Sequence, residues 1–264
     1  MKPNIVLVIC HDLGDVIGPY GYTDGETPRL DALAPQSMLF KRHFVASPGC
    51  SPSRAAMATG RYPHSNGMFG LAHLGWSMHP GEVTIAALLR EAGYKTGMFG
   101  TWHIEPPPLE SGFDVFSPPT HAEVAGANAI EWMTTQARSD APFFAMIGFF
   151  ETHRPFCGTD AQREAAKAMD KTKIDVPGYL PDAAPTRQDL AEFHQSVKVV
   201  DQNTGRLLDA LDAAGVASNT LFLFTVDHGI PFPRAKGTLY DPGIKAALLI
   251  RWPGSIAPGS TCEA

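Results

Sequence analysis

The stretch that decides the fold is NIVLVIC, residues 4–10, which runs directly into His11 and Asp12. Its unbroken apolar character predicts a core strand. A basic residue precedes it, as in a signal peptide, but no small-residue cleavage site follows. We therefore expect the strand to begin a sheet and the polar pair to lie at its carboxyl end.

Outward from this strand, short apolar runs alternate with amphipathic stretches, which predicts an α/β fold. We expect a large, mostly parallel mixed sheet with helices on both faces. Thr27 is expected to cap a helix that has Pro28 at its first position. The further predicted strands are 95–100, 143–150, 220–226 and 246–251, and the predicted helices are 28–36, 83–92, 125–138 and 187–214.

Proline and glycine concentrate in 105–120, 155–185 and 229–243, which we expect to be long loops on the rim of the sheet. No internal repeat, low-complexity tract or linker divides the chain. We therefore expect residues 1–264 to form one domain.

Composition narrows the classes of function. The 264 residues are 44% hydrophobic and 18% charged, as in an ordinary globular protein, and the formal net charge is −6. An acidic balance without a basic block argues against binding nucleic acid or an anionic membrane surface. No apolar stretch is long enough to span a bilayer. An anionic substrate must therefore be held by a local positive site.

The four cysteines, Cys10, Cys50, Cys157 and Cys262, are scattered and form no CxxC pair. This spacing suggests neither a disulfide framework nor a thiolate zinc site. It predicts a reduced, cytoplasmic setting.

Polar residues follow four of the predicted strands at their carboxyl ends, where ligands bind in open α/β sheets. Taken alone, each group could equally well form a turn or cap a helix. Their repetition from strand to strand favours a shared site. The groups are His11-Asp12, Thr101-Trp102-His103, Glu151-Thr152-His153-Arg154 and Asp227-His228-Gly229.

The strongest motif is CSPSR, residues 50–54, followed by AAMATG. Pro52 suits the first turn of a helix, which places Cys50 at the positive end of the helix dipole. Arg54 lies one turn later, so its guanidinium can return to the same end. A buried structural cysteine is the alternative interpretation.

These residues resemble the sulfatase signature, C-x-P-S-R followed by a small-residue helix, and the resemblance covers nearly the whole chain. It includes the opening strand, the segment 27–33, His103 and the strand that ends in Asp227-His228-Gly229. The segment GIPFP, residues 229–233, is most similar to the sulfamidases, which remove N-linked sulfate from glucosamine.

The resemblance implies that a formylglycine-generating enzyme oxidises Cys50 to formylglycine. One hydroxyl of its hydrate attacks sulfur, and the other is deprotonated by His103 to expel sulfate. His153 and Lys236 resemble the groups that bind sulfate and protonate the leaving group, and Trp102 is placed to stack on it. The implied substrate is a small sulfated molecule, with a carbohydrate as one candidate.

The resemblance also implies one divalent metal, calcium in most relatives. Asp12, Asp227 and His228 match its ligands, together with residue 50. His11 lies where many sulfatases have aspartate. If His11 binds the metal, it would shift the metal preference of the site from calcium towards manganese or zinc, and magnesium is another candidate. If it does not, His11 only orients the ligands or caps the backbone.

Thr101 is a second departure, because many sulfatases carry a lysine there. Lys95 lies too far back along its strand to replace it. The expected positive groups are therefore Arg54, Lys236 and protonated His153.

Several other residues are given simpler roles. We expect His64, His73 and His79 to be exposed loop residues, and the phenylalanine pairs 143–144 and 149–150 to be core residues. Glu151 and Arg154 either position His153, contact the substrate or form a local ion pair.

Two alternatives to a sulfatase stay open. Relatives with the same signature hydrolyse phosphonate monoesters or phosphodiesters. The chain also resembles a truncated, non-catalytic relative, because sulfatases usually continue into a small C-terminal subdomain and because Thr101 removes a charge.

Overall fold

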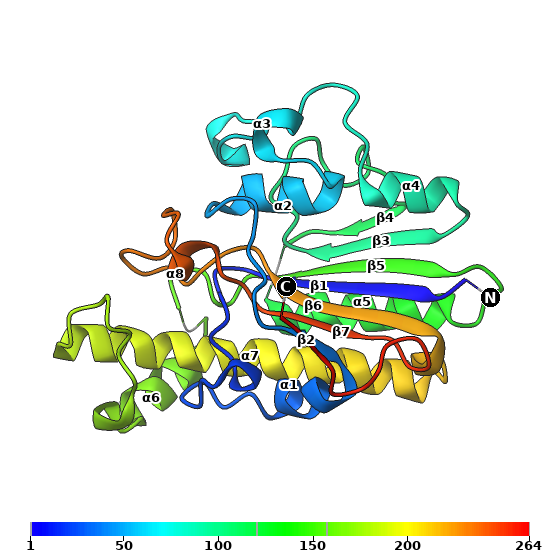
Figure 1. The fold of residues 1–264 in the computed structure, drawn as a ribbon. Coiled ribbons are helices and arrows are strands. Elements are labelled where there is room, and N and C mark those ends of the chain that lie inside the picture. The colour runs from blue at the N-terminus through cyan, green and yellow to red at the C-terminus, as the bar shows by residue number, and fades with distance from the viewer. Residues whose placement is uncertain (1, 120, 157, 264) are drawn as a thin grey trace.

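An eight-stranded mixed sheet has the strand predicted first, β1 (Asn4–Cys10), near its centre (Figure 1). The computed structural model describes residues 2–119, 121–156 and 158–263. β1 pairs in parallel with β5 (Phe143–Phe149) and β6 (Thr220–Val226). β3 (Lys95–Gly100) lies parallel beyond β5. The carboxyl ends of these four strands therefore meet at one edge of the sheet.

The remaining strands are short and complete both sides of the sheet, in the order β4-β3-β5-β1-β6-β7-β2-β8. β7 runs antiparallel to both β6 and β2. The bounds are β2 Met38–Phe40, β4 Val115–Ser117, β7 Leu248–Arg251 and β8 Thr261–Cys262.

Helices cover both faces of the sheet, which confirms the predicted α/β class (Figure 1). α2 (Cys50–Thr59), α3 (Pro63–Asn66) and α4 (Ile85–Glu91) lie on one face. The opposite face carries four further helices. They are α1 Pro28–Leu33, α5 Ala122–Gln136, α6 Asp160–Ala168 and α7 Ala184–Ala213.

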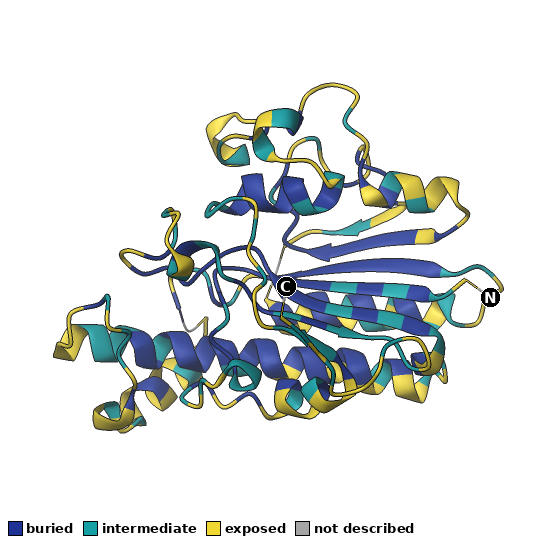
Figure 2. Ribbon diagram, in the orientation of Figure 1, coloured by how far each residue is buried: buried dark blue, intermediate teal, exposed yellow. Residues whose placement is uncertain are grey.

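β1 separates two buried apolar clusters because alternate side chains of a strand point to opposite faces. Val6, Val8 and Cys10 belong to the larger cluster, which includes α7 residues. Ile9 belongs to the smaller cluster, with Ala55 of α2. Figure 2 shows the buried residues concentrated along the central strands and the facing side of α7.

The structure corrects several expected boundaries. The helix predicted over 28–36 is α-helical only to Leu33 and continues as a 3₁₀ turn over Ala34–Gln36. β7 begins at Leu248, two residues later than predicted. β4 lies inside the predicted loop 105–120, and α8 (Asp241–Ile244) overlaps the end of the loop 229–243.

α6 lies inside the predicted loop 155–185, and its sequence carried a start signal. The Thr159 hydroxyl accepts from the Gln162 backbone N–H, while the Gln162 side chain accepts from the Thr159 N–H. This reciprocal capping box satisfies two amides at the helix start.

Thr27 precedes α1 as predicted, but its side chain does not cap that helix. The Thr27 hydroxyl accepts from the Gly18 amide and donates to Asp31. Asp201 of α7 instead accepts from the Arg29 and Leu30 amides. The expected local cap is therefore wrong, because a residue 171 positions from Leu30 takes its place.

Cys10 and Cys50 are buried free thiols, whereas Cys157 lies outside the described residues. Among the described helices, none is both long and apolar enough to cross a membrane.

Candidate functional site

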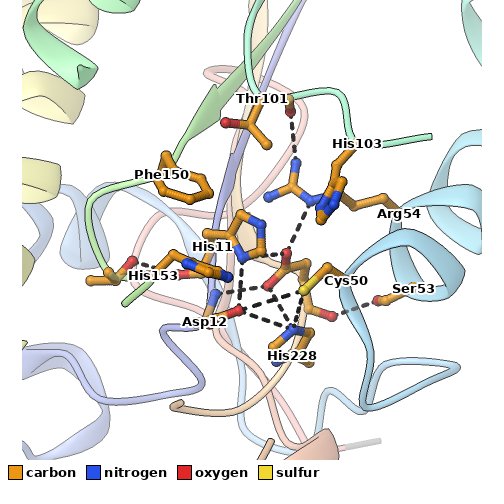
Figure 3. Close-up of polar contacts among 12 residues, drawn as sticks. His11, Asp12, Cys50, Ser53, Arg54, Thr101, His103, Phe150, His153 and His228 are labelled. Carbon is orange, nitrogen blue, oxygen red and sulfur yellow. Dashed lines mark hydrogen bonds and ion pairs between the residues drawn. The ribbon is translucent and has the colours of Figure 1, made fainter. Parts of the chain in front are cut away.

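All four polar groups at strand ends, together with the start of α2, converge at the carboxyl edge of the sheet (Figure 3). Five buried residues each place one potential ligand atom within 4.8 Å of all the others. They lie directly after β1, at the start of α2 and directly after β6, which are far apart in sequence. These residues are His11, Asp12, Cys50, Asp227 and His228.

Cys50 is the first residue of α2, so its side chain lies at the helix N-terminus, as the motif predicts. Its sulfur is 3.2 Å from Nε2 of His228. The Ser53 hydroxyl donates to the Asp227 backbone carbonyl at 2.5 Å, which ties the first turn of α2 to the end of β6. The helix thereby brings residue 50 to the carboxylates.

The backbone at Asp12 is bent to fit the cluster. Asp12 has a φ of 44°, in the left-handed region that residues other than glycine seldom adopt. Its amide donates to Oδ1 of Asp227 at 2.8 Å. Unfavourable backbone conformations of this kind concentrate at functional sites, where surrounding contacts impose them.

The two histidines direct a nitrogen at the same carboxylate oxygen. Nδ1 of His11 is 2.7 Å and Nε2 of His228 is 3.0 Å from Oδ1 of Asp12. Burial lowers the pKa of each imidazole, but Asp227 and Asp12 outweigh it and raise both pKa values. The buried carboxylates thus favour positive charge at this point of the cluster.

This donor set fits a divalent cation. Nδ1 of His228 lies 2.9 Å from the Gly229 carbonyl, an arrangement that protonates Nδ1 and leaves Nε2 as the metal-binding lone pair. Nε2 of His11 is buried and has no hydrogen-bond partner in the described structure. Two imidazoles with two carboxylates suit manganese or zinc better than calcium, which prefers oxygen ligands alone.

Arg54 is only 3% exposed and holds the cluster in place through two hydrogen bonds. Its Nε donates to Oδ2 of Asp227 and its Nη1 to the Thr101 carbonyl, both at 2.9 Å. A β-carbon on Gly148 would lie 2.1 Å from that carbonyl oxygen, so β3 and β5 meet here closely enough to require glycine. Lys95 begins β3 and is far from the site, as predicted.

Lys236, His103 and His153 surround the cluster. Nζ of Lys236 lies 2.6 Å from Oδ2 of Asp12. Burial would raise the pKa of the Cys50 thiol, but hydrogen bonding, first from His103 and then from His11 and His228, lowers it to about 4. Residue 50 is therefore in an environment that stabilises negative charge.

The His153 ring lies 4.7 Å from that of His11 and stacks on Phe150 at 4.6 Å. Burial, followed by smaller contributions from His11 and Lys236, lowers the pKa of His153 although Asp12 opposes the shift. This shift disfavours the protonated His153 that the sequence led us to expect, whereas Arg54 and Lys236 carry positive charge at the site without depending on a histidine.

Two cavities adjoin the site and share Pro119 and Phe150. One, of about 430 Å³, is lined by His73, Thr101 and His103. The other, of about 510 Å³, is lined by His121, Glu151 and His153. Both therefore lie beside histidines at the rim of the cluster.

Trp102 is more buried, and Phe150 more exposed, than the sequence predicted. The Trp102 ring is only 5% exposed, packs edge-on against Phe113 and donates its N–H to the Pro106 carbonyl. Its ring is therefore packed largely in the core, and the residue also lines the cavity of about 430 Å³ beside the site. Phe150, expected in the core, is 38% exposed and lies at the site because it follows the last residue of β5. Phe143, Phe144 and Phe149 are buried as predicted.

His73 is exposed as expected but also stacks on His103, with ring centroids 5.7 Å apart. The sequence carried no signal for this contact, because His73 lies in a loop 30 residues earlier. Glu151 accepts from the Ala122 amide at the start of α5. Arg154 forms a bidentate ion pair with Asp189 of α7.

Comparisons with known proteins agree with this geometry. A family model described as Sulfatase matches residues 3–263. Human N-sulphoglucosamine sulphohydrolase is 33% identical over 277 residues, which cover 95% of this chain and 55% of that protein. The chain thus spans about half the length of the curated relatives it matches.

Solved structures have the same fold. Ps i-CgsB, crystallised in complex with k-i-k-neocarrahexaose, has a TM-score of 0.82 at 25% identity, covering 100% of this chain and 68% of that one. Phosphonate monoester hydrolase of Agrobacterium radiobacter has a TM-score of 0.77 at 22% identity, covering 99% and 70%. From the family match, the chain belongs to the sulfatase family.

Proposed function

We propose that this chain carries the catalytic centre of a hydrolase that cleaves a sulfate ester or sulfamate. The observation that supports this most directly is the position of Cys50, at the N-terminus of α2 and within 4.8 Å of the carboxylate and imidazole ligand atoms. There, formylglycine produced from Cys50 by a formylglycine-generating enzyme would face both the helix dipole and the bound cation.

The residues around Cys50 are proposed to bind the metal and to position its ligands. Asp12, Asp227, His228 and His11 would hold one divalent metal with residue 50. When bound, the metal supplies positive charge that neutralises sulfate oxygens and acidifies the nucleophile. Arg54 holds Asp227 in place, and Lys236 holds Asp12 and extends to the sulfate.

His103 is proposed as the base that takes a proton from residue 50, next to which it lies. His153 is proposed to bind sulfate and to protonate the leaving group. Its lowered pKa disfavours the protonated form in the free site, so it would have to gain its proton as the anion enters.

The proposed substrate class is a sulfated carbohydrate, processed in a cytoplasmic setting. The name of the human relative, N-sulphoglucosamine sulphohydrolase, supports an N-linked sulfate on glucosamine. A phosphorus ester is the second candidate, because a phosphonate monoester hydrolase has this fold and the fold therefore does not choose between sulfur and phosphorus.

The test uses the chain co-expressed with a formylglycine-generating enzyme. Trypsin releases residues 43–54, which contain only Cys50 as cysteine. Conversion to formylglycine lowers the mass of this peptide by about 18 daltons. The same sample is assayed with an aryl sulfate, an N-sulfated glucosamine and an aryl phosphate diester, with added calcium, manganese or zinc.

The expected result is a converted peptide together with metal-dependent release of sulfate, which Cys50→Ala abolishes and Cys262→Ala leaves unchanged. Faster turnover of the phosphate diester would replace the sulfatase proposal with the phosphorus one. A converted peptide without turnover of any substrate would support a non-catalytic relative and contradict both.

A further inference from the structure

A third cavity, of about 340 Å³, lies on the other side of the loop that follows β1. Its walls come from that loop, from the segment 175–179, from α7 and from the start of α8. Figure 1 shows α8 over the first half of α7, on the same side of the molecule. We call this space the acidic cavity.

Carboxylates dominate the charge of the acidic cavity. Asp15, Asp24, Asp175 and Asp241 line it against a single lysine, Lys245. That lysine forms an ion pair with Asp15 at 2.8 Å. Among the described ion pairs, no lysine or arginine reaches the other three carboxylates. The cavity therefore carries an excess of negative charge that a cation would offset.

His194 of α7 adds a second observation, because its Nε2 faces Oδ2 of Asp24 at 3.9 Å, too far for a hydrogen bond. It lines the cavity, is only 3% exposed, and has no hydrogen-bond partner at either ring nitrogen within the described structure. Burial lowers its pKa to about 4, so the ring is neutral and offers one donor and one acceptor. A buried polar group without a partner is costly, which indicates a ligand that completes its hydrogen bonding.

Aromatic rings give the cavity an apolar surface as well. Tyr22 and Tyr179 line it and are half-buried, and Phe193 is fully buried beneath. Burial raises the pKa of Tyr179 to about 12 and also raises that of Tyr22, so both phenols stay uncharged. Aromatic faces beside carboxylates favour organic cations.

A metal ion fits this lining less well. In the part of the chain that the structure describes, only the Cys50 cluster brings three or more ligand atoms of histidine, cysteine or carboxylate together. The carboxylates of the acidic cavity are spread around its wall, as is suitable for a larger ligand.

We propose that the acidic cavity binds a small organic cation, an ammonium group carried on an apolar or aromatic body. The ammonium group would lie by Asp24 and Asp175, its body between Tyr22 and Tyr179, and His194 would hydrogen-bond to the ligand. The site is separate from the proposed catalytic centre, but the two share a wall, since the Gly14 amide donates to the His228 carbonyl at 2.9 Å.

Isothermal titration of the full chain with tyramine tests the proposal, with 4-ethylphenol as its uncharged counterpart. Tyramine is expected to bind at one site at least about tenfold more tightly than 4-ethylphenol, because only tyramine carries the ammonium group. Asp24→Asn and Asp175→Asn are each expected to weaken tyramine about tenfold. Asp140→Asn is the matched control, since it removes an exposed carboxylate elsewhere in the chain.

Thermal unfolding confirms that each variant is folded, and Asp175, whose side chain is exposed, is the variant least able to disturb the fold. Equal affinity for tyramine and 4-ethylphenol would overturn the proposal. So would unchanged binding in both cavity variants, or no saturable binding of tyramine at about 10 mM. None of these outcomes bears on sulfate hydrolysis, because no turnover is measured.

Discussion

His11 puts a second imidazole into a cluster that otherwise has two carboxylates, one histidine and Cys50, and its Nδ1 lies 2.7 Å from Oδ1 of Asp12. We predict that His11→Asp increases affinity for calcium relative to manganese by at least about tenfold, because an added carboxylate oxygen favours the harder ion. Equilibrium dialysis with metal analysis measures this directly.

The control is His64→Asp, the same change at an exposed loop histidine away from the cluster. An unchanged metal preference in His11→Asp would show that His11 only orients Asp12 and Asp227. Both histidine variants remain informative in protein whose Cys50 is unmodified, because binding alone is measured.

At the scale of elements, α1 is attached to α7 through a carboxylate. Asp201 accepts from the Arg29 and Leu30 amides, and burial raises its pKa from 3.8 to about 6 although those hydrogen bonds oppose the shift. The folded state thus binds this proton more tightly than the unfolded state. Its contribution to stability is greatest below pH 4 and falls as the pH rises through about 6.

We therefore predict that Asp201→Asn removes part of the stability loss between pH 4 and pH 6, because the uncharged amide needs no proton. The measurement is the free energy of unfolding in urea at pH 4.5 and pH 7 for the wild type and the variant. Asp140→Asn, at an exposed position, is the control. Equal pH dependence in the wild type and Asp201→Asn would contradict the assignment.

At the scale of the whole molecule, the cluster joins three elements that meet only in the folded chain: β1, α2 and β6. A metal that binds there binds the folded state alone, so it stabilises by about 2.7 kcal/mol at a hundred times its dissociation constant. We predict that manganese raises Tm by at least about 5 °C above the value in chelator.

Calorimetry with manganese, zinc, calcium and chelator checks this. Asp227→Asn is expected to abolish the shift, since it removes a central ligand. A Tm that no metal changes would contradict a metal centre in this chain, whatever the state of Cys50.

Sequence alone was enough for the α/β class and for the principal strands, because buried parallel strands need apolar runs and helices need amphipathic ones. β1, β3 and β6 have the predicted bounds. It was also enough to select the residues of the cluster: His11, Asp12, Asp227 and His228 follow parallel strands that share one edge of the sheet, and Cys50 begins the CSPSR motif.

Only the tertiary structure decided which neighbours those residues have. The short strands β2 and β8 depend on pairing partners, so no local pattern marks them. Asp201 replaces Thr27 as the cap of α1, Trp102 packs inward, and His73 meets His103 through contacts between distant segments. The physical reason is that hydrogen bonding and packing are satisfied by proximity in space, whereas a sequence records only proximity along the chain.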